Sequence, residues 1–102
     1  MNRAIDIAPE QRAALAAIFS RFLPGVAVWA YGSRVNGSAQ PNSDLDLVVF
    51  SSPEQRAALG ELQEEIAESS AIPYIVDLHV WNQLPESFQK NIQQEHEVLI
   101  EG

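Results

Sequence analysis

Two short motifs in the middle of the chain combine residue types suited to binding a phosphate group and a metal ion. Gly32 and Ser33 follow one apolar segment, and Asp44 and Asp46 lie ten residues further on, at the start of another. A Gly-Ser pair at the mouth of a turn can present backbone N–H groups to an anion. Aspartates at positions i and i+2 project from one face of a strand, roughly 6–7 Å apart along it. This pattern predicts a phosphate-binding turn beside a metal site, and it indicates a protein that handles a nucleoside triphosphate.

Carboxylates also occur where the surrounding sequence makes them costly. Asp46 and Asp77 each stand between two apolar residues, and alternation places both on the strand face opposite to those neighbours. Aspartate is depleted in strands, and a buried carboxylate without a partner is strongly destabilising. No Lys or Arg lies close by in the sequence. A divalent metal held by Asp44, Asp46 and Asp77 would supply the missing positive charge, and oxygen ligands suit Mg²⁺ or Mn²⁺.

Each feature alone also has an ordinary structural explanation. A Gly-Ser pair is usually only a turn. Asp44 could cap the loop before it, and Asp77 could face water at the edge of a sheet. Together the residues form a chemically coherent set, and this favours the functional interpretation.

Periodic apolar residues predict the elements that must position this set. Turn formers bound the apolar runs that we expect to be strands, and proline or a capping box marks the expected helix starts. In chain order we expect a helix from Pro9 to Phe22, a strand over 26–31, a short helical turn over 33–36, a loop over 37–43, a strand over 45–50, a helix from Ser52 to a break at 72–73, a strand over 74–81, a helix over 85–94, and a short edge strand or extended tail over 98–100.

Length and charge bound the class of protein. A chain of 102 residues predicts one domain, covering residues 1–102. The net charge of −8 disfavours direct binding to nucleic acid, although a metal-bound triphosphate could still be accommodated. The absence of cysteine excludes disulfides, thiolate nucleophiles and Cys-based zinc sites. We see no signal peptide and no apolar run of membrane-spanning length, so we expect a soluble cytoplasmic protein.

The spacing of the motifs resembles a known superfamily. Gly32-Ser33, ten residues, Asp44-x-Asp46 and the later strand residue Asp77 are similar to the pattern of the DNA polymerase beta-type nucleotidyltransferases. Within that superfamily the chain resembles the minimal nucleotidyltransferases, small proteins often paired with a helical HEPN partner as toxin and antitoxin. The likeness covers nearly the whole chain. It implies an α+β fold, with helices packed against a mixed β-sheet.

The resemblance also implies a role for each residue of the motifs. Asp44 and Asp46 would hold two metal ions, and Asp77 would bind the catalytic one and help to deprotonate the attacking hydroxyl. Gly32 and Ser33 would bind the β- and γ-phosphates. The implied reaction is in-line attack on the α-phosphorus, with pyrophosphate as the leaving group.

Arg34 would add a charge-assisted contact to the phosphates. Its importance would be greater here than in relatives with further basic loop residues, because this chain has Asn36 and Gln40 there. Larger relatives carry a helical domain that binds the acceptor. We therefore expect a partner protein or a second copy of the chain to take that place.

Five other polar or aromatic residues have more ordinary interpretations. We interpret His79 as a partly exposed structural histidine that could touch the site, and Trp29 and Trp81 as core residues rather than a platform for a nucleobase. His96, between two glutamates, is expected at the surface. Ser43 is expected to order the turn before the aspartate pair.

Two functions from different classes remain open. The first is an enzyme that transfers a nucleotide, AMP from ATP being the first choice, to a hydroxyl on its partner, as an antitoxin would modify a HEPN toxin. The second is a binding module that neutralises a helical partner by occlusion, with a vestigial metal site. A small-molecule acceptor is a third and weaker alternative, because the chain has no evident substrate domain.

Overall fold

The computed structural model describes residues 5–102, and at its centre is a four-stranded mixed sheet. The strand order is β3-β2-β1-β4. Strand β1 pairs antiparallel with both of its neighbours, whereas β2 and β3 are parallel. The strands are β1 (Val28–Tyr31), β2 (Leu45–Val49), β3 (Val76–Val80) and β4 (Glu97–Ile100). The predicted α+β class is confirmed.

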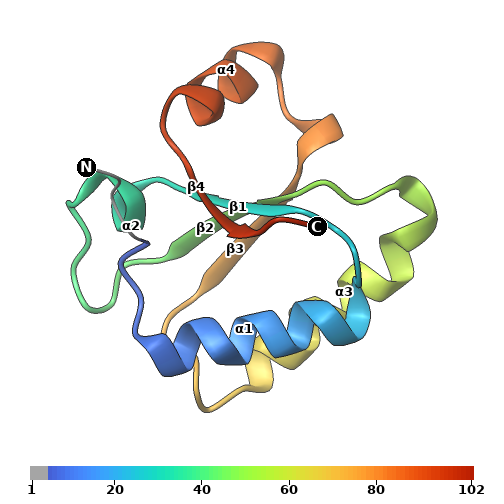
Figure 1. Cartoon of the computed structure of the whole chain (residues 1–102), viewed down its shortest axis with the longest axis horizontal. Helices are drawn as coiled ribbons and strands as arrows, with labels where there is room; N and C mark the ends of the chain where they lie inside the picture. Colours follow the sequence, from blue (N-terminus) through green and yellow to red (C-terminus); the bar gives the residue numbers. More distant parts are fainter. Residues whose placement is uncertain (1–4) are drawn as a thin grey trace.

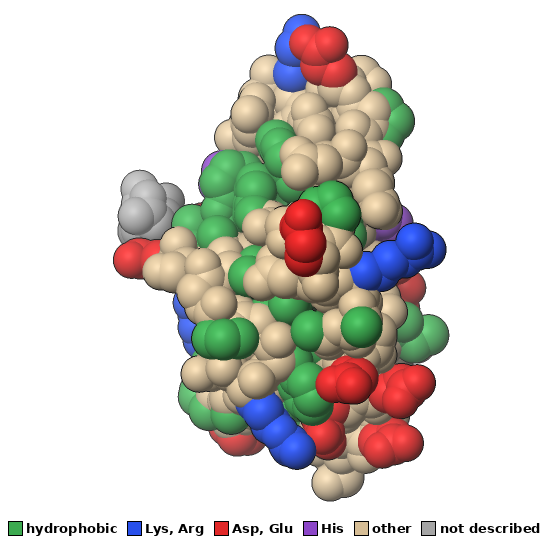
Figure 2. Space-filling model, turned by 90° about the vertical axis from the view of Figure 1, so that its right-hand side faces the viewer, with side chains coloured by type: hydrophobic (Ala, Val, Ile, Leu, Met, Phe, Trp, Pro, Cys, Tyr) green, Lys and Arg blue, Asp and Glu red, His purple; other side chains and the backbone are tan. Residues whose placement is uncertain are grey.

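Helices cover the two faces of the sheet unequally. Figure 1 shows α1 and α3 side by side on one face, while α4 lies on the opposite side of the sheet. The helices are α1 (Pro9–Phe22), α2 (Ser33–Asn36), α3 (Arg56–Glu68) and α4 (Glu86–Gln94), with 3₁₀ turns η1 (Pro53–Gln55) and η2 (Trp81–Gln83). Acidic side chains gather at the end of the molecule that α1 and α3 form (Figure 2).

The core lies between the sheet and the pair α1 and α3. Alternate residues of β1 and β2 point into it, and each helix contributes a buried stripe at helical spacing. Fully buried members include Leu15 and Phe19 of α1, Leu45 and Leu47 of β2, and Leu62 of α3. Because this face of the sheet is filled, the other set of alternate residues is the one available for function.

The connection between β2 and β3 decides what that second face presents. Parallel neighbours require a crossover, which α3 supplies, so the two strands start at the same end of the sheet. Tyr31, Asp46 and Asp77 then form one row across three strands. Trp29 and His79 belong to the next row, on either side of Val48.

Most element boundaries agree with those expected. The strand expected over 26–31 starts at Val28. The one expected over 74–81 starts only at Val76, and it ends at Val80 because Trp81 already belongs to η2. The capping box between Ser52 and Gln55 is confirmed, although it opens a 3₁₀ turn before α3. Residues 97–100 form an edge strand rather than a free tail. Within residues 5–102, no helix has the length and apolar character needed to cross a membrane.

Candidate active site

Two of the predicted metal ligands lie side by side on the face of the sheet away from α1 and α3. Asp46 of β2 and Asp77 of β3 are register partners in the parallel pair, where strands lie about 4.8 Å apart. Burial raises the pKa of Asp46, and repulsion from Asp77 and then from Asp44 raises it further. The three aspartates therefore share one electrostatic field, as the sequence predicts for a cation site.

Gly32 sits directly against one of these carboxylates. Its φ of 81° and ψ of −152° belong to a region that is essentially restricted to glycine. A Cβ at this position would lie 2.5 Å from Oδ2 of Asp46, closer than real Cβ contacts come. The glycine thus allows the turn to approach the carboxylate, and it brings the start of α2 to the aspartate row.

Ser33 opens the short helix that follows this glycine. The N–H groups of Val35 and Asn36 donate to the Gly32 carbonyl, which leaves the N–H groups at the very start of the turn outside the helical hydrogen-bond pattern. Such N–H groups are suited to receive an anion. Ser33 is half-buried beside them, so its hydroxyl can add a donor to the same position.

Arg34 does not occupy the position expected for a phosphate ligand. The residue is only 5% exposed, and its guanidinium lies over the ring of Tyr74, 4.0 Å from the centroid. It donates to the carbonyls of Ser43 (3.0 and 2.7 Å), Asp6 (2.8 Å) and Pro41 (3.1 Å). Four of its five N–H donors are used in this way. Arg34 therefore holds the loop that leads to the aspartate pair, and it does not face the site.

His79 makes a direct contact with the row of aspartates. Its Nε2 lies 3.3 Å from Oδ2 of Asp77, and both side chains are partly exposed on the edge strand. The expectation of a partly exposed histidine agrees with this, and so does the suggestion that it could touch the site. Its positive form would lower the pKa of Asp46, opposing the repulsion within the row.

Tyr31 is a site residue that the sequence reasoning missed. It stands opposite Asp46, and burial, with repulsion from Asp46 and Asp77, raises its pKa to about 12. The phenol therefore stays protonated at neutral pH and can donate a hydrogen bond at the row of aspartates. Its place next to Gly32 at the end of an apolar strand was the signal that could have identified it.

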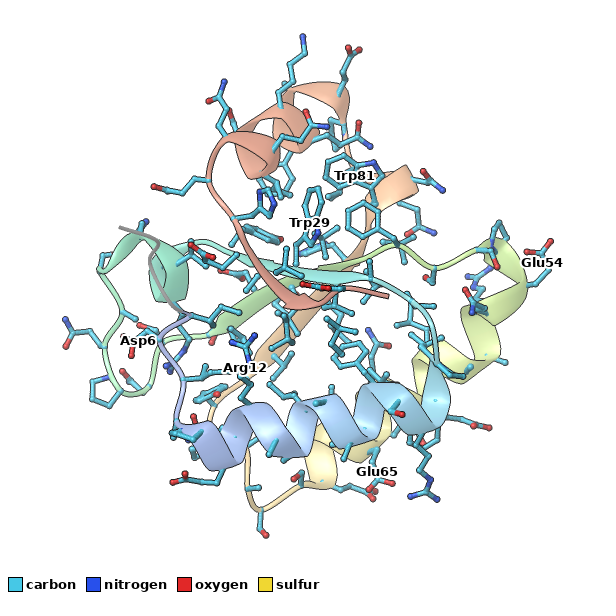
Figure 3. All side chains as sticks on the ribbon, viewed as in Figure 1. Asp6, Arg12, Trp29, Glu54, Glu65 and Trp81 are labelled. Carbon is cyan, nitrogen blue, oxygen red and sulfur yellow. The ribbon has the colours of Figure 1, made fainter. Side chains whose placement is uncertain are left out.

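Aromatic rings, among them Trp29 and Trp81, fill the space between the sheet and α4 (Figure 3). Trp29 contacts Phe50 and Trp81, with ring centroids 4.6 and 5.6 Å apart. Both tryptophans pack against other rings, but they are only half-buried and lie outside the core between the sheet and the pair α1 and α3, whereas we expected them to be core residues. The expectation for His96 is wrong. It is half-buried, stacks on Trp29 at 3.9 Å and lies 2.9 Å through Nδ1 from the Ile92 carbonyl.

The loop before the aspartate pair is ordered by its own polar groups. The hydroxyl of Ser43 accepts a hydrogen bond of 2.8 Å from the Gln40 N–H, as expected for a residue that orders this turn. Gly37 ends α2 with a left-handed conformation, φ 87°. Together with the Arg34 contacts, these bonds define the path from the Gly-Ser turn to Asp44.

The carboxylates suit a hard divalent cation by their chemistry. Their donor atoms are all oxygens on neighbouring positions. The carboxylates repel one another, and such a cation would neutralise the negative charge that causes this repulsion. Within residues 5–102, no three His, Asp or Glu side chains already converge on one point as a closed metal cage would require. The aspartates would have to turn toward a bound cation, which the exposure of Asp44 and Asp77 permits.

Comparison with known proteins identifies the family. The family described as "Polymerase beta, Nucleotidyltransferase" matches residues 14–102. The chain belongs to this family. The predicted class of enzyme, a nucleotidyltransferase, is thereby confirmed.

Individual known proteins show which members of the family this nucleotidyltransferase resembles. It is 38% identical over 98 residues to the "Probable protein adenylyltransferase MntA" of Haemophilus influenzae, covering 95% of this chain and 85% of that protein. The fold is similar to a solved structure described as a toxin-antitoxin with AMP-PNP, with a TM-score of 0.66 and 21% identity over 90% of this chain and 73% of the other. A second structure, of a mutant toxin-antitoxin MntA-HpeT, has a TM-score of 0.65 and 18% identity over 86% and 71%. Both similarities are in the fold, and they agree with the α+β architecture described above.

Proposed function

We propose that this nucleotidyltransferase transfers AMP from ATP to a hydroxyl group of a partner protein, in a reaction that depends on Mg²⁺ or Mn²⁺. The observation that carries the proposal is the row in which Asp46 and Asp77 lie side by side, with Gly32 against Asp46 and the start of α2 next to it. A triphosphate held at that turn would have its charged groups next to the carboxylates that bind its metal.

The nature of the acceptor rests on the relatives. The name of the Haemophilus influenzae protein supports a protein acceptor and an adenylyl group. The toxin-antitoxin structures support a partner, which we propose to be a helical HEPN-type toxin with this chain as its antitoxin. Residues 1–102 would act as one nucleotidyltransferase domain in the cytoplasm, with the partner or a second copy completing the acceptor side.

Each residue of the site has its own role in the proposed reaction. Gly32 and Ser33 bind and orient the β- and γ-phosphates through backbone N–H groups and the hydroxyl. Asp44, Asp46 and Asp77 would hold the divalent metal, which when bound stabilises charge on the phosphates and the entering oxygen. Arg34 acts indirectly, because it fixes the loop that carries Asp44.

Bond changes follow from that arrangement. The acceptor oxygen attacks the α-phosphorus, one P–O bond forms, and the bond from the α-phosphorus to the bridging oxygen breaks. Pyrophosphate leaves with the bonding electrons. Asp77, which is partly exposed at the edge strand, accepts the proton of the hydroxyl.

The test compares the wild type with Asp77→Asn, which keeps the shape of the side chain and removes its charge. Each protein is incubated with α-labelled ATP, Mg²⁺ and the product of the neighbouring gene, and the label is located by mass spectrometry. Label on a partner hydroxyl with the wild type, and a loss of at least about a hundredfold with Asp77→Asn, supports the proposal. If neither protein labels the partner and both inhibit it equally, the chain is a module that acts by occlusion.

A further inference from the structure

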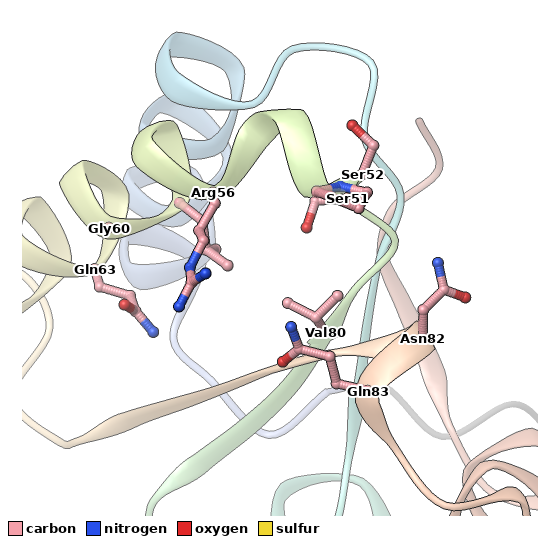
Figure 4. Close-up of a pocket in the computed structure, with 10 residues that line it drawn as sticks. Ser51, Ser52, Arg56, Gly60, Gln63, Val80, Asn82 and Gln83 are labelled. Atoms are coloured by element: carbon pink, nitrogen blue, oxygen red, sulfur yellow. The ribbon is translucent and has the colours of Figure 1, made fainter.

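A pocket lies at the opposite end of β2 and β3 from the aspartate row. It has a volume of about 460 Å³ and opens between the start of α3, the segment after β2 and the turn η2 (Figure 4). This volume lies in the range of pockets that bind small molecules. The aspartates stand at the start of β2 and β3, on the other face of the sheet, so the pocket is separate from the candidate active site.

A cation without a protein partner lines this pocket. Among residues 5–102, no group forms an ion pair or hydrogen bond with the guanidinium of Arg56. Figure 4 shows Arg56 and Gln63 of α3 pointing toward the same open space as Gln83 of η2. No Asp or Glu lines the pocket in the described part of the chain, although the protein carries a net charge of −8.

The hydroxyl of a largely buried residue opens into the same space. Ser51 is only 4% exposed, and none of the described residues forms a hydrogen bond with its side chain. The hydroxyl is nevertheless not sealed in the interior, because it lines the pocket (Figure 4). Because the hydroxyl keeps access to solvent through the pocket, a ligand there could replace water as its hydrogen-bond partner.

A glycine in the helix beside the pocket leaves space there, at a cost in helix stability. Gly60 lies in the interior of α3, where glycine destabilises a helix by about 1 kcal/mol relative to alanine. No close packing requires it, because a Cβ at this position would meet nothing within 4 Å. Gly60 lines the pocket, so any larger side chain would project into it.

We propose that this pocket is a second ligand site, which binds a small organic anion. A carboxylate or phosphate group is held by Arg56 and by the hydroxyl of Ser51, and the apolar body of the ligand lies against Val80 and the cleared surface at Gly60. The amides of Gln63 and Gln83 line the opening and can adjust to polar groups of the ligand.

The test uses amide chemical shifts of the full chain, titrated with benzoate, phenyl phosphate and neutral benzamide. Saturable shifts of the Ser51, Arg56 and Gly60 signals with either anion support the site, and the anion that binds more tightly identifies the headgroup. The proposal is overturned if the anions shift only the signals of Gly32 and Ser33, if no shift saturates, or if benzamide binds as tightly as the anions.

Two variants test separately the positive charge of Arg56 and the open volume beside Gly60. Arg56→Gln should weaken anion binding by at least about tenfold, since a hydrogen bond to a charged group is lost. Gly60→Leu should abolish binding by filling the pocket, while Ala57→Leu, on an exposed position of the same helix outside the pocket, should leave it unchanged. Wild-type affinity in Arg56→Gln, or in a folded Gly60→Leu, overturns the proposal.

Discussion

Replacing Gly32 with alanine should disrupt the site as well as destabilise the fold. The substitution places a Cβ 2.5 Å from Oδ2 of Asp46, where an ordinary contact needs at least 3.4 Å, so the carboxylate or the turn must move by most of an ångström. A misplacement of about 1 Å in a reacting constellation can lower the rate about a hundredfold. We therefore expect a loss of transfer of that order.

The cost to the fold can be measured against a second glycine. Gly25 has a φ of 76°, similar to the 81° of Gly32, but a Cβ there would meet nothing within 4 Å. Backbone strain should make Gly25→Ala less stable by about 1–2 kcal/mol. Gly32→Ala should lose about 1–3 kcal/mol from strain, plus the cost of displacing Asp46.

Urea unfolding gives the two stabilities, and titration calorimetry with Mg²⁺ and AMP-PNP gives the affinity of the site. Gly25→Ala should bind the nucleotide like the wild type, whereas Gly32→Ala should bind it at least about tenfold more weakly even where it is fully folded. If both variants bind the nucleotide with wild-type affinity and transfer at the wild-type rate, the turn does not form the phosphate site.

Three further predictions concern neighbouring residues. Arg34→Met should lower the free energy of unfolding, measured in urea, by about 3 kcal/mol, because buried carbonyls lose their donors. If the variant instead loses nucleotide affinity with unchanged stability, Arg34 contacts the phosphates and its structural role is wrong. Because burial and then repulsion from Asp77 raise the folded pKa of Asp46 above 3.8, ionisation of this carboxyl removes stability as the pH rises through that folded pKa. Asp46→Asn should therefore raise the Tm of the metal-free protein at pH 7, and this gain should disappear below pH 3.8. The variant should also lose the stabilisation by Mg²⁺ in thermal melts, which for the wild type is about 2.7 kcal/mol of unfolding free energy when Mg²⁺ is present at a hundred times its Kd. Ser33→Ala should weaken triphosphate binding by about 1.5–3 kcal/mol in calorimetry, while the exposed control Ser38→Ala should not; equal effects would exclude a hydroxyl contact.

Local rules determined much of this protein from its sequence. Alternation along a strand places Asp46 on the face opposite to its leucine neighbours, whatever the strand later pairs with. The helices were predictable because their signals are also local. These signals are the helical spacing of apolar residues, proline at the helix starts and the capping box at Ser52, and each involves residues within one or two turns. The positive φ of Gly32 agrees with the turn that its sequence context predicts.

Long-range packing decided the rest. The parallel register that sets Asp77 beside Asp46 depends on α3 crossing between β2 and β3, which no short window of sequence encodes. Arg34 directly follows Ser33 and was expected to contact the phosphates, yet its donors reach carbonyls at Asp6 and in the following loop, because burial of a guanidinium requires acceptors for its N–H groups. His96 looks like a surface residue between two glutamates, and only the return of β4 alongside β1 brings it onto the ring of a tryptophan in the neighbouring strand.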